Sequence, residues 1–228
     1  MTTIEEIKHT LEQLPVDERE LVANWLLELN KSRRSRVEEP RPAYAAVQTL
    51  FMTVDEYLEL EEKSPVRHEY VNGVVHAMSG PSVAHARITR ELLAAVRSHL
   101  RRGPCEPFAT DLKLFIRSDT DEIYYYPDLM VACRREDWGP NYIRNPKLLA
   151  EVLSPSTKFI DLREKAMAYR RIASVEEYVL LEQNEYKVIV QRREESWRPH
   201  EYLGPEAAAQ LRSIGLSVPL AQIYEGTL

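Results

Sequence analysis

Hydrophobic residues near the start of the chain repeat at helical spacing. They form two stripes, Ile4, Ile7, Leu11 and Leu14, followed by Leu21, Trp25, Leu26 and Leu29, which predict two amphipathic helices. Pro15 separates the stripes, because proline limits the helix that precedes it. Residues 31–42 carry charge, serine and proline without an apolar period, as a linker does. The pattern predicts an N-terminal helical hairpin and linker over residues 1–40, and a second domain over residues 41–228.

Capping and turn residues mark the elements that follow. Thr53 and Glu56 have the spacing of a capping box, which predicts a short helix to about Glu62. Asn72-Gly73 lies between two apolar runs, residues 68–71 and 74–78, and this pair is the strongest short signal for a β-hairpin. Ser82 is a favoured N-cap, so we expect a long helix from there to the Gly-Pro pair at 103–104.

The second half of the chain alternates between strand and helix patterns. We expect strands over residues 111–117, 123–126, 129–133 and 147–153, a helix over 161–172, and strands over 177–182 and 187–193. The tail predicts a strand near 200–203 and a helix near 206–212. The order of helix, three strands, helix and strand indicates an α/β (α+β) fold with a mixed sheet flanked by helices.

Composition agrees with a soluble globular protein, with 44% hydrophobic and 29% charged residues among 228. The net charge of −6 argues mildly against nucleic-acid binding, but divalent cations bound to carboxylates would offset part of it. The chain has no secretion signal at its start and no apolar run long enough to cross a membrane. Two cysteines, Cys105 and Cys133, fit a reducing compartment, although a disulfide between them stays open. We therefore expect a cytoplasmic protein.

Glu151 is anomalous, because it lies within the apolar run Leu148–Leu153. A carboxylate there is costly unless it is paired or bound to metal, or unless it faces solvent on an edge strand. Asp128 follows Pro127 at the start of another strand, where turn chemistry is the plain alternative. Two carboxylates on neighbouring strands can bind one divalent cation and leave coordination sites for water and phosphate.

Several motifs resemble one nuclease family. They are Tyr126-Pro127-Asp128, Ala150-Glu151-Val152-Leu153-Ser154-Pro155-Ser156-Thr157, Asp161-Leu162-Arg163-Glu164-Lys165, Glu69-Tyr70-Val71-Asn72-Gly73 and Ser82-Val83-Ala84-His85. Over residues 53–203 the chain resembles the PD-(D/E)xK nuclease superfamily, and within it the bacterial "putative restriction endonuclease" domain family. The resemblance implies a restriction-endonuclease-like fold with an αβββαβ core. It also implies an endonuclease that hydrolyses DNA with Mg²⁺, or with Mn²⁺ as a substitute.

The resemblance also implies roles for particular residues. Asp128, Glu151 and the carbonyl of Val152 are the expected metal ligands. The superfamily lysine would stand at position 153, which is Leu153 here, so we assign its role to Lys165, with Lys158 as the competing candidate. Glu69 is expected to bind the metal or a metal-bound water, although it is equally well explained as an exposed hairpin residue.

Candidate substrate contacts surround these positions. They are His85, Ser154, Ser156, Thr157 and Tyr169. A surface or capping role for the histidine, and a helix-entry turn for the Ser-Pro-Ser-Thr segment, are the structural alternatives.

Two other functions remain open. The first is a catalytically silent nucleic-acid-binding or regulatory module, favoured by Leu153 and by the acidic charge. The second is an assembly protein whose helical hairpin binds a protein partner. The unpaired apolar faces of that hairpin, and the two active sites that a double-strand cutter needs, predict a homodimer.

Overall fold

The computed structural model describes residues 51–109, 111–154 and 160–228. Its helices are α3 (Val54–Lys63), α4 (Val83–Leu100), α6 (Ala166–Arg171) and α7 (Leu220–Ile223), with a π-helix η2 (Asp161–Lys165) and 3-10 turns η1 (Arg135–Asp137), η3 (Arg193–Glu195) and η4 (Arg212–Ile214). Its strands are β1 (His68–Val71), β2 (Val74–Ala77), β3 (Glu106–Ala109), β4 (Lys113–Arg117), β5 (Glu122–Tyr125), β6 (Leu129–Ala132), β7 (Tyr142–Ile143), β8 (Leu148–Leu153), β9 (Glu177–Glu182), β10 (Lys187–Arg192), β11 (Pro199–Leu203), β12 (Ala208–Leu211) and β13 (Leu216–Pro219). The hairpin and linker predicted for residues 1–40 lie outside the described residues.

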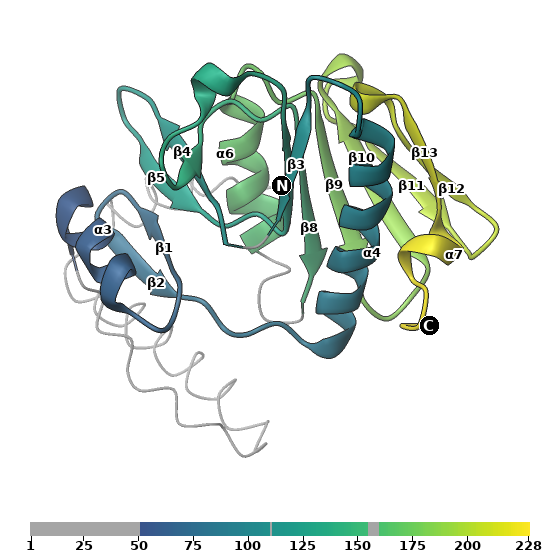
Figure 1. Ribbon diagram of the computed structural model, residues 1–228, viewed down its shortest axis with the longest axis horizontal. Coiled ribbons are helices and arrows are strands. Elements are labelled where there is room, and N and C mark those ends of the chain that lie inside the picture. The colour runs from purple at the N-terminus through teal and green to yellow at the C-terminus, as the bar shows by residue number, and fades with distance from the viewer. Residues whose placement is uncertain (1–50, 110, 155–159) are drawn as a thin grey trace, which may run out of the picture. The chain divides into compact units, whose positions relative to one another are not determined.

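A six-stranded mixed sheet forms the centre of the fold, in the order β11-β10-β9-β8-β6-β3 (Figure 1). Strand β8 runs parallel to β9 and antiparallel to β6. Along the chain, α4, β3, β6, β8, α6 and β9 give the order αβββαβ, which confirms the expected fold class. The last core strand pairs in parallel because the chain crosses over through a helix before it returns to the sheet.

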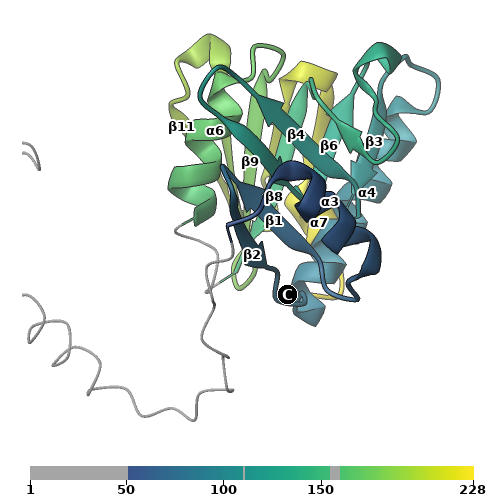
Figure 2. The same ribbon diagram turned by 90° about the vertical axis from the view of Figure 1, so that its left-hand side faces the viewer.

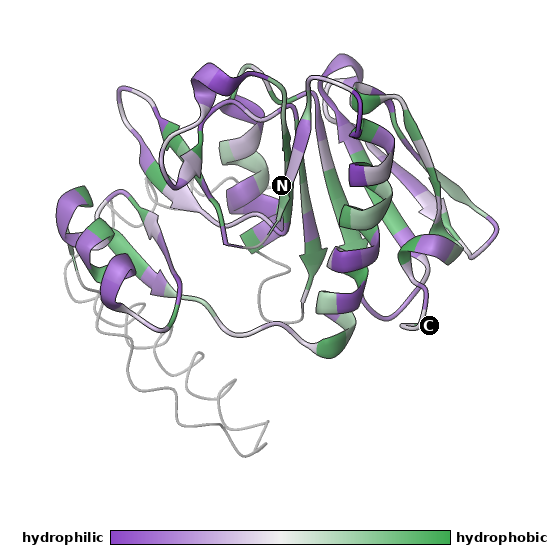
Figure 3. Ribbon diagram, viewed as in Figure 1, coloured by the Kyte–Doolittle hydropathy of each residue, from purple (hydrophilic) through white to green (hydrophobic). Residues whose placement is uncertain are grey.

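Alternating residues of β8 pack against helices on opposite faces of this sheet. Leu148, Ala150 and Val152 belong to the core that contains the apolar face of α4. Leu149 and Leu153 belong to the core that contains α6. Figure 3 shows hydrophobic and hydrophilic residues interspersed along α4, as expected for a helix with one buried face. Because side chains alternate along a strand, Glu151 lies on the α6 face with Leu149 and Leu153.

A second sheet, in the order β2-β1-β5-β4-β7, is covered by α3 (Figure 2). Five buried residues form its core beneath this helix, namely Tyr57, Tyr70, Val75, Phe115 and Tyr124. The predicted capping box of α3 is present, with Thr53 and Glu56 bonded reciprocally. The predicted hairpin turn is also present, with positive φ at Asn72 and Gly73. These local signals gave the correct elements because backbone geometry determines them.

The expectation of one mixed sheet was partly wrong, because the strands before the crossover helix belong to two sheets. Residues 113–117 and 122–125 lie in the second sheet, whereas the first core strand is β3, which was not predicted. Strand β3 is a four-residue edge strand that contains Pro107, and edge strands tolerate proline. It lacks the alternation that identifies a half-buried strand.

Two further expectations need correction. The helix expected near residues 206–212 is instead strand β12, paired with β13, because Ala209 and Leu211 point into the core at strand spacing. Cys105 and Cys133 form a disulfide. They extend the β3–β6 register by one residue, since Glu106 pairs with Ala132. The disulfide removes the support that free thiols gave to a reducing compartment.

Candidate active site

Asp128 and Glu151 meet where β6 and β8 separate. The register of the two strands ends at Leu129 opposite Ala150, one residue short of both carboxylates. The main-chain N–H of Asp128 donates to Oε2 of Glu151 over 3.3 Å. The N–H of Val152 donates to Oδ2 of Asp128 over 2.7 Å. Side chains therefore replace the missing ladder bonds and bring the two acids together, as the sequence predicted.

The backbone of Val152 also faces this site. In an extended strand, the N–H and the C=O of one residue point to the same side. Since the N–H of Val152 points at Asp128, its carbonyl is directed to the same side of β8. The side chain of Val152 packs in the α4 core, so only its main chain contributes to the site.

Lys165 is surrounded by carboxylates. Its Nζ lies 3.0 Å from Oε1 of Glu69, 3.2 Å from Oε1 of Glu151 and 3.5 Å from Oδ1 of Asp161. Lys165, Glu151 and Asp161 are almost fully buried. Asp161 and Lys165 are the first and last residues of the π-helix η2, a form that often occurs at functional sites.

Tyrosines form the deep wall of this cluster. The hydroxyl of Tyr169 donates to Oε1 of Glu151 over 2.8 Å, and Tyr169 is fully buried. The hydroxyl of Tyr178 donates to the main-chain oxygen of Asp161 over 3.0 Å and so holds η2 against β9. The ring of Tyr125 lies 5.5 Å from Nζ of Lys165. Glu151, Asp161 and Lys165 are thus each held in place by a neighbouring tyrosine.

His85 approaches the site from the other face of the sheet. Its Nε2 lies 3.0 Å from Oδ2 of Asp128. Ser82 is the N-cap of α4, and its hydroxyl accepts a hydrogen bond from the N–H of His85. The same hydroxyl donates to Oε1 of Gln183. The side-chain amide of Gln183 donates to the carbonyl of Leu153. The start of α4 is therefore tied to the end of β8, and the histidine is aimed at Asp128.

The cluster holds more negative than positive charge. Burial raises the pKa of Glu151, the nearby Lys165 lowers it, and the charges of Asp128 and Asp161 raise it further, with a net increase. Burial opposes the charged form of Lys165, but Glu151, Glu69 and Asp161 outweigh that effect and raise its pKa. One ammonium therefore faces several carboxylates, and an additional cation would lower their mutual repulsion.

The donor set fits a hard divalent cation only if main-chain and water oxygens take part. Within residues 51–109, 111–154 and 160–228, no three side chains of His, Cys, Asp or Glu converge as a ready-made metal site. Mg²⁺ in proteins is bound by one or two carboxylates, with water and substrate oxygens completing its shell. Asp128, Glu151 and the carbonyl of Val152 fit that pattern.

Most of the predicted site residues lie in or beside this cluster. Asp128, Glu151, Lys165, Glu69, His85 and Tyr169 come together in it. Ser154 follows directly after β8 and is half-buried, whereas Ser156, Thr157 and the competing Lys158 lie outside the described residues. Asp161 was not predicted as a member of the site. Its i,i+4 spacing to Lys165 was the available signal.

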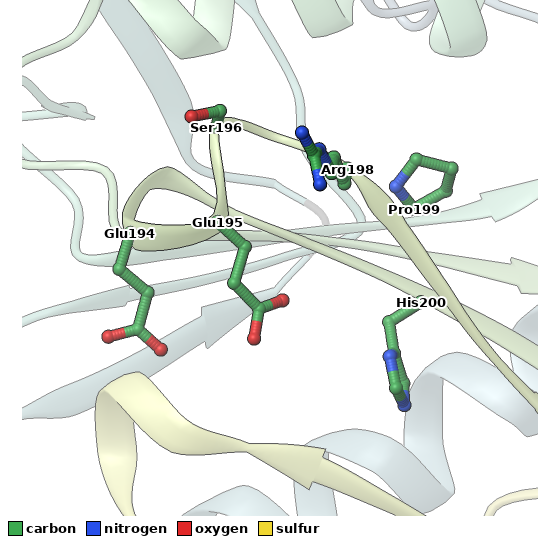
Figure 4. A pocket seen from close by; sticks show the side chains of 6 residues that line it. All are labelled: Glu194, Glu195, Ser196, Arg198, Pro199 and His200. Carbon is green, nitrogen blue, oxygen red and sulfur yellow. The ribbon is translucent and has the colours of Figure 1, made fainter.

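A separate hollow lies on the turn between β10 and β11 (Figure 4). Its lining residues are Glu194, Glu195, Ser196, Arg198, Pro199 and His200. It shares no residue with the cluster, so the cluster and not this hollow is the candidate active site.

The fold and the site define a restriction-endonuclease-like protein. Residues 54–221 match the model of the Uma2 family, described as "Putative restriction endonuclease", and the chain belongs to this family. It is 32% identical over 178 residues to an uncharacterised protein of Synechocystis sp., covering 77% of this chain and 92% of that protein. It is 34% identical to a second uncharacterised Synechocystis protein, covering 61% of this chain and 80% of that protein.

The fold is also similar to a solved structure. A protein from Anabaena variabilis, titled "a putative nuclease belonging to DUF820", aligns with a TM-score of 0.63 and 18% identity, covering 78% of this chain and 99% of that one. Among the described residues, no helix has the length and apolar content needed to cross a membrane.

Proposed function

We propose that this chain is a Mg²⁺-dependent endonuclease that hydrolyses phosphodiester bonds of DNA. The observation that carries the proposal is the imbalance of charge in a buried cluster. One ammonium, that of Lys165, lies within 3.5 Å of the carboxylates of Glu69, Glu151 and Asp161. The charge of Asp128 adds to theirs and raises the pKa of Glu151. Membership of a restriction-endonuclease family supports the same chemistry.

Asp128, Glu151 and the carbonyl of Val152 would hold Mg²⁺, with Mn²⁺ as a substitute. The bound ion would lower the pKa of a water molecule and neutralise charge on the phosphate. The arrangement of Asp128 and Glu151 is already fixed by main-chain N–H groups. Little reorganisation is therefore needed before the ion binds.

Lys165 takes the part of the missing motif lysine. Its ammonium is held by Glu69 and Asp161 as well as by Glu151. It would therefore keep two carboxylate partners besides Glu151 if Glu151 also bound a metal ion. From this position it orients a water molecule and stabilises negative charge that develops on the phosphate. The side chain of Glu69 is 14% exposed. It would accept a hydrogen bond from the water molecule that Lys165 orients.

The remaining residues position these groups. Tyr169 is fully buried, so we assign it to holding Glu151 rather than to substrate contact. His85 holds Asp128, and its partly exposed ring donates to a substrate phosphate. Ser154, Ser156 and Thr157 remain candidate phosphate contacts at the end of β8.

Cleavage of DNA under metal control tests this function. Supercoiled DNA is incubated with the protein in Mg²⁺, Mn²⁺ or a chelator. We expect cleavage only with metal, and a loss of at least about 100-fold in Asp128→Asn and Glu151→Gln, because each removes a metal ligand. Glu201→Gln, an exposed carboxylate on β11, is the control for charge. Cleavage that persists in both ligand variants overturns the proposal.

Leu153 favours a second candidate, a nucleic-acid-binding module without catalysis. It occupies the usual position of the motif lysine and is only 2% exposed within the α6 core. The same experiment separates the two, since the module would bind DNA and leave it intact in every metal.

We also propose that the protein is a homodimer, and that residues 1–40 bind a protein partner. Light scattering at micromolar concentration tests the dimer, and a monomer would contradict it. Light scattering of a variant that lacks residues 1–40 then shows whether this segment forms the dimer interface.

A further inference from the structure

Lys113 is a nearly buried lysine outside the cluster, at the start of β4. It is 5% exposed, and its Nζ lies 5.6 Å from the centre of the Tyr126 ring. In the part of the chain that the structure describes, no ion pair or hydrogen bond reaches this ammonium. Burial lowers the pKa of Lys113. A cation in this position costs free energy that no carboxylate offsets directly.

The carboxylates around Lys113 are engaged elsewhere. Glu61 accepts hydrogen bonds from the main-chain N–H and the ring Nδ1 of His68, at 3.0 and 2.8 Å, and from the hydroxyl of Tyr126. Asp111 is paired with Nε of Arg67 over 3.6 Å. Neither carboxylate therefore forms an ion pair with the ammonium of Lys113.

A second cation lies beside the start of β4, because Nε of Arg67 is 3.6 Å from Oδ1 of Asp111, two residues before Lys113. After burial, Glu61 has the larger effect and raises the pKa of Lys113, the guanidinium of Arg67 lowers it through repulsion, and the exposed Glu62 raises it. The side chain of Arg67 is 47% exposed. Two like charges held near one another, one buried and one exposed, are stabilised by an anion that contacts both.

These groups lie at the end of the second sheet that leads to the candidate active site. Arg67 precedes β1, Lys113 begins β4 and Tyr126 follows β5, which lies between those two strands. The chain continues from Tyr126 through Pro127 to Asp128. The N–H of Tyr126 donates to Oε1 of Glu69, a member of the cluster, over 3.3 Å.

The spacing suits a nucleic-acid strand. Strands β1 and β4 are two positions apart in the sheet, roughly 10 Å at the usual distance between strands. Phosphates along one strand of a duplex advance about 3.4 Å per nucleotide along the axis. A nucleic-acid strand that enters the cluster beside Glu69 and crosses this end of the sheet would therefore reach Lys113 within a few nucleotides.

We propose that Lys113, assisted by Arg67, binds a backbone phosphate of a nucleic-acid strand a few nucleotides from the phosphodiester held at Asp128 and Glu151. The site rests on the proposed nuclease function. An ammonium binds phosphate as a point charge and reads no base. This phosphate site would fix the position of the nucleic-acid strand along the protein without selecting a base sequence.

The salt dependence of binding tests the assignment. A fluorescent single strand and a duplex of 20 nucleotides are titrated by anisotropy at several salt concentrations, in Ca²⁺. The proteins are the unaltered chain, Lys113→Gln, Lys113→Arg, and Lys187→Gln on β10 as the control for charge. Loss of one phosphate contact reduces the slope of log affinity against log salt by about 0.7 for the single strand and 0.9 for the duplex. At 0.1 M salt this corresponds to an affinity lower by about five- to eightfold.

We expect that reduction in Lys113→Gln, with Lys113→Arg and Lys187→Gln close to the unaltered chain. Thermal melting of each variant shows that it is folded. An unchanged slope in Lys113→Gln, or an equal reduction in Lys187→Gln, overturns the phosphate site while leaving the nuclease function in place. Absence of nucleic-acid binding by the unaltered chain overturns the nuclease function itself.

Discussion

The main-chain N–H of Val152 donates to Oδ2 of Asp128 over 2.7 Å. This bond joins the end of β8 to the residue just before β6, where the pairing of the two strands has stopped. The carboxylate of Asp128 is therefore oriented by backbone that belongs to the next strand. A carboxylate held in this way is organised before any cation or substrate arrives.

Lys165 is expected to stabilise the fold as well as the site. Lys165→Met leaves Glu69, Glu151 and Asp161 without their shared ammonium. We expect a loss of about 3–5 kcal/mol in the free energy of unfolding at pH 8 with a chelator present. Burial already raises the pKa of Glu151 and Lys165 lowers it, so removal of the ammonium leaves this pKa further above its value in the unfolded chain. Stability is retained at low pH and is lost as the pH rises.

Urea denaturation of Lys165→Met at pH 5 and pH 8 checks this sign. Lys63→Met is the control, because Lys63 forms an exposed pair with Glu59 and such pairs contribute little. A deficit in Lys165→Met that is the same at both pH values would contradict the account.

Lys113 is expected to reduce stability. Burial lowers its pKa, so the unfolded chain binds the proton more tightly than the folded one. The stability of the unaltered chain therefore rises with pH until the ordinary pKa of lysine is passed. We expect Lys113→Met to melt at a higher temperature than the unaltered chain at pH 7, with a smaller difference at pH 10. Calorimetry at both pH values measures it, and a lower melting temperature for the variant at pH 7 would be evidence against the buried charge.

Arg192 holds the β12–β13 hairpin against the central sheet. Its guanidinium is 1% exposed and donates to Oε1 of Glu177 over 2.9 Å and to the carbonyl of Gln210 over 2.6 Å. Arg192→Met leaves Glu177 buried without its cation, and we expect a loss of about 3–5 kcal/mol in urea denaturation. Lys63→Met, which breaks an exposed pair with Glu59, should cost less than about 1 kcal/mol. Similar losses of stability in the two variants would show that the buried ion pair contributes no more than the exposed one.

The disulfide between Cys105 and Cys133 closes a loop with a sequence separation of 28. A loop of this length is expected to stabilise the protein by about 3.6 kcal/mol through the unfolded state. Denaturation with and without reductant measures that contribution, and the Cys105→Ser, Cys133→Ser double variant should lose stability without responding to reductant. A melting temperature unchanged by reduction would show that the bond does not form in solution.

Local patterns of the sequence determined the elements that build the site. A carboxylate between Leu148 and Leu153 is unusual whatever the fold, and Asn72-Gly73 favours a tight turn by its backbone alone. The assignment of strands to two sheets did not follow from such patterns. β3, β4 and β5 are all short, and the choice of partner depends on residues far along the chain.

By itself, therefore, the sequence determined that Asp128 lies at the start of one strand and Glu151 within another, because hydrophobic alternation and turn residues act over a few positions. Only the tertiary structure decided that Glu69, Asp161 and Lys165 form one buried cluster with them, and that Lys113 lacks a carboxylate partner. Those contacts join residues up to about a hundred positions apart. Their formation depends on how the two sheets and α6 pack, which no local pattern specifies.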